Sequence, residues 1–173
     1  MEIIYEKYVI HINIKKLKAY KLKFNSSFTL YYHKLFDNDW SLESYKEICS
    51  FDNIAKFWIL YNNHTCLNNG MYFLMKKNIK PIYEDKNNKK GGYWSIKINQ
   101  KDIKNIWLHL VLDFIGCNLS NKNIINGLSI VYKKKFYIIK IWIKNKKYKD
   151  IKNLNIDLDN ISKTNILYNN FDN

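Results

Sequence analysis

An aromatic ring and a carboxylate stand side by side at Tyr83-Glu84, two residues after the only proline of the chain, Pro81. A run rich in lysine and asparagine, residues 86–90, and a double glycine, Gly91-Gly92, follow. A planar ring can stack on a base, and an ionised carboxylate can accept two parallel hydrogen bonds from one edge of it. Guanine offers such an edge, so this stretch is typical of a base-reading site.

The charge of the chain favours an anionic partner. The formal net charge is +14, from 29 basic residues against 15 acidic ones, and every basic residue is lysine. A field of this size attracts nucleic acid or an anionic surface. The four histidines are scattered without metal-ligand spacing, and no glycine-rich phosphate loop occurs. We therefore expect a binding protein rather than an enzyme, with no cofactor and no metal.

The length, the cysteines and the apolar runs of the chain bear on its domain number and its cellular location. A chain of 173 residues is one domain by length and needs no disulfide to form a core. The three cysteines, Cys49, Cys66 and Cys117, are widely spaced, which favours reduced thiols. The N-terminus lacks the features of a signal peptide, and no apolar run of about 18 residues follows. These features predict a cytoplasmic monomer with no membrane contact.

Apolar periodicity predicts the elements that must position such a site. Period-2 alternation predicts strands over residues 28–34, 71–75, 93–98, 128–131, 136–143 and 166–168. Helical spacing predicts helices over about 53–62 and 102–115, the second closed by Gly116, and allows a short one over about 146–153. Residues 1–27 are expected to form a basic and apolar arm before a domain over 28–173. This order predicts an α+β domain with a mostly antiparallel sheet covered on one face.

Several apolar residues have two interpretations from pattern alone. Trp40 follows a polar loop and is either a satellite of the core or a binding platform. Phe57 and Trp58 lie about 100° apart on their helix, so one of them is expected to face outward. Leu108 and Leu112 are left over beside the main apolar stripe, which indicates either a fully covered helix or an exposed strip for a partner.

The order of these motifs resembles the messenger-RNA cap-binding translation initiation factor 4E family. The resemblance runs through Trp40, Phe51-Asp52, Phe57-Trp58 with Leu60-Tyr61, Pro81 with Tyr83-Glu84-Asp85, Gly91-Gly92-Tyr93-Trp94, Trp107-Leu108 with Ile115-Gly116, Gly127 and Trp142. It implies a curved, mostly antiparallel sheet of about eight strands. The helices would lie on the convex face and the ligand slot on the concave face.

The resemblance also implies roles for single residues. The two stacking aromatics of the family fall on Trp40 and Tyr83, its guanine-reading carboxylate on Glu84, and its ring near the N7-methyl group on Trp142. Methylation at N7 makes guanine cationic, so each ring would add cation–π attraction to stacking, worth about 1–3 kcal/mol. The carboxylate would pair with the N1 and N2 hydrogens, which other bases do not present together.

The chain departs from the family pattern at three positions that would contact the cap. Tyr83 stands where tryptophan is usual, Lys133 aligns with a phosphate-binding arginine, and Ile138 aligns with a phosphate-binding lysine. Solvation alone would explain lysines at the turn that includes Lys133. With the resemblance, we predict that Lys133, together with Lys135 or Lys140, neutralises the cap phosphates.

A second surface follows from the resemblance. Family members dock a helical peptide of the scaffold initiation factor 4G, or of repressors, on the dorsal face, at positions that match Ile54, Trp58, Leu108 and Leu112. His109 replaces a usual glutamate, and residues 22–24 replace a usual His-Pro-Leu. The hypotheses are therefore recruitment of capped messenger RNA for translation, a cap-binding repressor or decoy that does not recruit the scaffold, and a single-stranded RNA binder without cap specificity.

Overall fold

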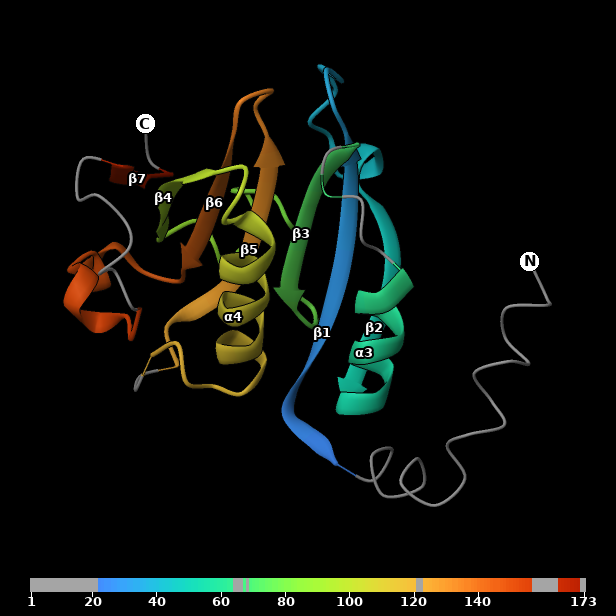
Figure 1. The fold of residues 1–173 in the computed structure, drawn as a ribbon. Helices are drawn as coiled ribbons and strands as arrows, with labels where there is room; N and C mark the ends of the chain where they lie inside the picture. Colours follow the sequence, from blue (N-terminus) through green and yellow to red (C-terminus); the bar gives the residue numbers. More distant parts are fainter. Residues whose placement is uncertain (1–21, 64–66, 68, 121–122, 157–164, 172–173) are drawn as a thin grey trace, which may run out of the picture.

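The computed structural model describes residues 22–63, 67, 69–120, 123–156 and 165–171 (Figure 1). Its centre is one antiparallel sheet in the order β2-β1-β3-β5-β6-β4-β7. The strands are β1 (Lys23–Lys34), β2 (Lys46–Asn53), β3 (Gly70–Lys76), β4 (Gly92–Asn99), β5 (Ile125–Tyr132), β6 (Phe136–Ile143) and β7 (Ile166–Asn170). The predicted α+β class is confirmed, and the described sheet has seven strands rather than about eight.

Two helices cover one face of the sheet, α3 (Ile54–Asn63) and α4 (Ile103–Ile115), close to the predicted ranges (Figure 1). The Asn53 side chain starts α3 by accepting a hydrogen bond from Lys56 N at 3.0 Å. Gly116 follows α4 with an ordinary φ of −80°, and the left-handed residue is instead Cys117 at φ 62°. The helix considered over 146–153 forms two 3₁₀ turns, Lys146–Tyr148 and Ile151–Asn153.

The sequence patterns did not predict β2. Within the described sheet, this strand lies at one edge and pairs with β1. Lysine, glutamate and serine interrupt its apolar residues, as is common at an edge that faces water on one side. Of the N-terminal arm, residues 1–21 lie outside the described residues, and residues 23–27 form the start of β1.

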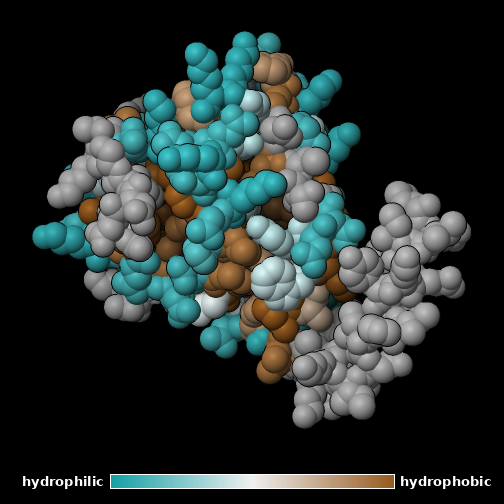
Figure 2. Space-filling view, in the orientation of Figure 1, coloured by the Kyte–Doolittle hydropathy of each residue, from teal (hydrophilic) through white to brown (hydrophobic). Residues whose placement is uncertain are grey.

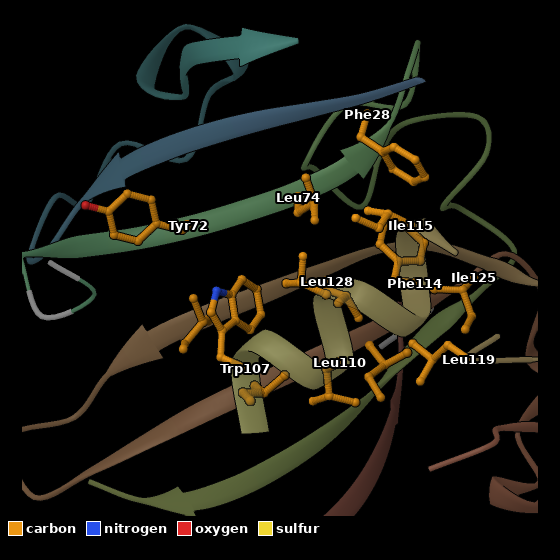
Figure 3. Close-up of a cluster of buried hydrophobic side chains, with 14 of the residues drawn as sticks. Phe28, Tyr72, Leu74, Trp107, Leu110, Phe114, Ile115, Leu119, Ile125 and Leu128 are labelled. Carbon is orange, nitrogen blue, oxygen red and sulfur yellow. The ribbon is translucent and has the colours of Figure 1, made fainter. Parts of the chain in front are cut away.

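The main core lies between the helices and the sheet. Figure 3 shows Trp107, Leu110 and Phe114 of α4 against Phe28 and Leu128 of the strands, all buried. Strand residues of the opposite parity form a smaller cluster on the other face, made by Tyr31, Phe73, Met75 and Trp142. We call this second side the helix-free face. Because side chains alternate between the two faces along β1, this strand contributes residues to both clusters.

The double glycine at the start of β4 is required by close backbone approach. A Cβ atom on Gly91 would lie 1.9 Å from the carbonyl oxygen of Ile143, and one on Gly92 would lie 2.3 Å from that of Asn169. Any side chain here would push β6 and β7 away from β4. The glycines thus anchor the C-terminal end of the loop over residues 77–91, which carries Tyr83 and Glu84.

Candidate nucleic-acid interface

The loop that carries Tyr83 and Glu84 is held from within by Asp85 and Asn88. The Asp85 carboxylate accepts from Lys80 N at 2.9 Å and from Asn87 N at 2.8 Å. Asn88 is fully buried, and its amide donates to the carbonyl oxygens of Lys80 at 2.9 Å and Ile82 at 2.7 Å. Because the loop's inner polar groups are satisfied by its own side chains, it can keep a defined shape without regular structure.

Asn126 of β5 ties this loop to the sheet. Its buried amide donates to the carbonyl oxygen of Asn87 at 2.7 Å and to Oδ1 of Asn88 at 2.9 Å. The sequence analysis missed Asn88 and Asn126 as positioning residues. In a chain so rich in asparagine, no spacing distinguishes two amides that meet across 38 positions.

Tyr83 and Glu84 are both exposed on the outside of this loop, with Tyr83 56% exposed. The Glu84 carboxylate raises the pKa of the Tyr83 hydroxyl, first through a hydrogen bond and then through its charge. The predicted ring and carboxylate therefore form one small polar and aromatic unit that faces solvent.

Trp40 is outside both buried clusters and is 54% exposed. One face of its indole stacks on the ring of His33, with centroids 4.5 Å apart and planes 9° apart. The buried His33 lies at the base of the loop: Nδ1 is 2.9 Å from Lys34 O, and Nε2 is 2.7 Å from Asp39 O. Each ring nitrogen thus lies within hydrogen-bond distance of a carbonyl oxygen at one end of the loop that leads to Trp40. Of the two interpretations of Trp40, its exposure favours the platform.

A chain of ring contacts places these groups on the helix-free face. The Tyr45 ring lies 4.8 Å from that of His33 and 5.2 Å from that of Phe73. Phe73 in turn lies 6.1 Å from Trp142. The pKa of Tyr45 is raised to about 12, mainly by burial and further by the charge of Glu84, which places that carboxylate near the same chain. The structure thus gathers these predicted residues on one side of the sheet.

Trp142 is only 6% exposed, and its Nε1 donates to Ser129 Oγ at 3.0 Å. Lys140 lies on the same face of β6, and its Nζ is 4.1 Å from the ring centroid of Tyr93. Burial lowers the pKa of Lys140, and the nearby charge of Lys133 lowers it further. Lys133 and Lys135 are exposed at the β5–β6 turn. Two of the three predicted phosphate ligands are therefore close enough to repel each other, a repulsion that a bound anion would relieve.

On the other side of the sheet, Phe57 faces the core and Trp58 faces outward, 38% exposed, so the expectation that one of them is outward is confirmed. The other three dorsal residues, Ile54, Leu108 and Leu112, are half-buried and pack against the main core. Figure 2 views this side and shows hydrophobic residues between hydrophilic ones over the helices. Leu108 and Leu112 of α4 are therefore neither fully covered nor fully exposed: each packs partly against the core and is partly open to solvent.

In the described part of the chain, no group of histidine, cysteine, aspartate and glutamate could hold a metal ion. No helix within the same residues is long and apolar enough to cross a membrane. Cys49 and Cys117 carry free thiols, and Cys66 lies outside the described residues.

Comparison with known proteins identifies the family of the chain. A model of the family described as eukaryotic initiation factor 4E matches residues 23–172. The chain belongs to this family. It is 36% identical over 133 residues to eukaryotic translation initiation factor 4E1 of Drosophila melanogaster, covering 71% of this chain and 50% of the relative. It is 32% identical over 134 residues to factor 4E of Candida albicans, covering 70% and 64%.

The chain therefore spans less than two thirds of the length of these relatives. The matched family is one of translation initiation factors.

Solved structures of factor 4E proteins share the fold. Ascaris suum eIF4E-3 in complex with m7G cap superposes with a TM-score of 0.71 at 25% identity, covering 87% of this chain and 91% of that one. Caenorhabditis elegans eIF4E-3 in complex with the 4E-binding protein Mextli superposes with a TM-score of 0.66 at 25% identity, covering 76% and 80%. The arrangement of sheet and helices described above is thus the factor 4E arrangement.

Replacing Asn88 by alanine tests the internal hydrogen bonds of the 77–91 loop. The change leaves two carbonyl oxygens without their donor, and we expect the free energy of unfolding to fall by about 1–3 kcal/mol. Amide exchange over residues 80–85, followed by mass spectrometry, should become faster. Lys89→Ala, at an exposed position of the same loop, is the matched control and should change neither quantity. Unchanged exchange in Asn88→Ala would contradict the positioning role.

Replacing His33 by phenylalanine separates the two ways in which it supports Trp40. The ring stack can persist, but hydrogen bonding between the ring nitrogens and the loop carbonyls is lost, at a cost of about 1–3 kcal/mol in unfolding free energy. Amide exchange over residues 35–40 should accelerate. His109→Phe, on the exposed side of α4, is the control for the substitution itself. If exchange in this loop stays at the parental rate, the hydrogen bonds of His33 do not hold it.

Proposed function

We propose that this chain binds the 7-methylguanosine cap of messenger RNA on its helix-free face. One observation carries the proposal: two aromatic rings are exposed on that face. The Trp40 ring is stacked on a second ring, and the Tyr83 ring has a carboxylate beside it. Trp40 is backed by His33, and Tyr83 and Glu84 project from a loop braced by Asn88. A cationic purine between the two rings gains stacking and cation–π attraction, and Glu84 accepts from its N1 and N2 hydrogens.

Trp142 would form part of the floor of this slot, near the N7-methyl group. Its burial and its hydrogen bond to Ser129 fix the indole plane, so the methyl group would meet a rigid apolar surface. The phosphates would be neutralised by Lys133, Lys135 and Lys140. Lysine meets them as a point charge, which gives attraction without the geometric selectivity of an arginine fork.

The dorsal face would dock a helical peptide of a scaffold of the factor 4G type. Trp58, the most exposed of the four dorsal residues, would be the anchor, with Ile54, Leu108 and Leu112 beside it. Through both faces the protein would recruit capped messages for translation in the cytoplasm. A repressor or decoy role is the alternative, since His109 stands at the rim of this surface where a glutamate is usual, and peptide binding decides between the two.

The cap slot is tested by comparing m7GTP with GTP in a fluorescence or calorimetric titration. The parent chain should prefer m7GTP, because only the methylated base is cationic. We expect Trp40→Ala to weaken m7GTP binding by about 1–3 kcal/mol, roughly 5- to 150-fold. Tyr83→Ala should act similarly, whereas Tyr83→Phe, which keeps the ring, should retain most of the affinity.

Glu84→Gln tests the edge readout in the same titration. The neutral amide cannot accept both guanine hydrogens, so m7GTP affinity should fall while stacking remains. Equal binding of m7GTP and GTP by the parent chain would instead favour a single-stranded RNA binder without cap specificity.

The dorsal face is tested with Trp58→Ala and a helical scaffold peptide carrying tyrosine and leucine anchors. The loss of one buried indole at an interface should weaken peptide binding by about 2 kcal/mol or more. Binding of m7GTP should stay at the parental level, because Trp58 lies across the sheet from the slot. Loss of both activities would mean that Trp58 supports the fold. A parent chain that binds m7GTP but no scaffold peptide would favour the decoy role.

A further inference from the structure

A basic pocket opens beyond the end of β6, outside the residues assigned to the cap slot. It has a volume of about 390 Å³ and is lined by Asn87, Asn126, Lys144, Asn145, Lys147 and Tyr148. Its walls come from three segments that are distant in sequence: the 77–91 loop, the start of β5 and the first 3₁₀ turn after β6. No role in the proposed cap binding uses its two lysines or its tyrosine.

The walls of the pocket are fixed by hydrogen bonds. Asn126 donates to the 77–91 loop, and the Asn87 amide donates to Asp85 Oδ1 at 2.9 Å. Asn145 Oδ1 accepts from Lys147 N at 2.9 Å, which leaves the amide Nδ2 of Asn145 as the group able to donate to a ligand. A preformed polar cavity of this kind loses little conformational entropy on binding.

The ammonium groups of the pocket have an aromatic neighbour rather than an acidic one. Lys144 Nζ lies 6.0 Å and Lys147 Nζ 5.0 Å from the ring centroid of Tyr148, and both lysines are exposed. The salt bridge found in the described residues joins Lys56 and Asp52, at the start of α3. Among the described residues, neither of these two ammonium groups has a carboxylate partner.

Two carboxylates on or next to these segments accept hydrogen bonds from the backbone. Asp85 accepts from the backbone of its own loop, and Asp150 Oδ1 accepts from Lys152 N at 2.9 Å. Further lysines occur in the same segments at positions 86, 89, 90, 146 and 149. The 3₁₀ turn that begins at Lys146 is joined to the 77–91 loop by a hydrogen bond of 2.9 Å, which Lys146 N donates to Lys90 O. The segments that line the pocket therefore carry more lysines than carboxylates, and this excess of positive charge attracts an anion.

Two features select RNA among anionic ligands. A tyrosine ring flanked by ammonium groups suits a strand that alternates bases and phosphates, whereas an acidic peptide offers no planar group for the ring. The pocket also lies close along the chain to the proposed slot: Lys144 comes directly after β6, two residues or about 7 Å beyond Trp142, and Asn87 follows Glu84 by three residues. We propose that this pocket binds the phosphodiester backbone of a single-stranded RNA, independently of the cap.

The test uses the full chain and a fluorescent uncapped single-stranded RNA of about 12 nucleotides. Binding is followed by anisotropy at several salt concentrations, and m7GTP binding is titrated in parallel. Lys144→Gln/Lys147→Gln should weaken RNA binding about tenfold and reduce the slope of log K against log salt by about 1.4, the value for two phosphate contacts on a single strand. Binding of m7GTP should be unchanged.

Three controls accompany the double variant. Lys101→Gln/Lys104→Gln removes the same charge at exposed positions beside and within α4 and should retain parental RNA binding. Lys144→Arg/Lys147→Arg keeps the charge and should restore binding. Thermal unfolding verifies that each variant is folded.

The proposal is overturned if the glutamine double variant binds uncapped RNA with the affinity and salt slope of the parent. It is also overturned if the α4 control loses as much affinity, since the field as a whole would then be responsible. Binding of a polyglutamate peptide, but not RNA, through these lysines would overturn it in favour of a protein ligand. The titration with uncapped RNA tests RNA binding by the pocket alone. Its result holds whether or not the parent chain discriminates m7GTP from GTP, which tests the proposed cap binding.

Discussion

The placement of Tyr83 and Glu84 depends on one buried amide, that of Asn88. It satisfies two carbonyls of its own loop and accepts from Asn126, so the loop is closed on itself and attached to β5 by the same group. A loop whose inner polar groups are paired can present its outer side chains to solvent in a defined direction. Without this bridge, the ring and the carboxylate would be adjacent in sequence but would have no fixed orientation toward the sheet.

The two faces of the sheet separate the two proposed binding surfaces. On β1, Phe28 and Leu30 pack under the helices, while Tyr31 and His33 point to the helix-free face. The core that supports Trp58 and α4 is therefore distinct from the ring chain that supports Trp40. Because alternation assigns neighbouring residues of one strand to opposite faces, a substitution on one face disturbs the other little unless it shifts the strand itself.

Sequence patterns predicted most of the elements and could not predict how their side chains meet. Strands and helices with strong periodicity lie close to the expected ranges, whereas the polar edge strand β2 has too few apolar residues for its period to be visible. The resemblance located Trp40, but only coordinates reveal the stack on His33 that covers one face of its indole. Asn88 and Asn126 were missed because pairing of buried amides depends on tertiary contact and leaves no local pattern.

The absence of arginine divides the work of recognition between two kinds of interaction. An ammonium group attracts phosphate from any direction, so in the proposed functions the lysines at the β5–β6 turn and in the basic pocket would supply affinity that falls with salt and carries little selectivity. Selectivity would then come from groups with fixed planes and edges, namely the supported indole of Trp40, the Tyr83 ring and the Glu84 carboxylate. This is why the bracing of these groups by His33 and Asn88 matters more here than it would beside arginine forks. The lysines tolerate imprecise placement, and the rings do not.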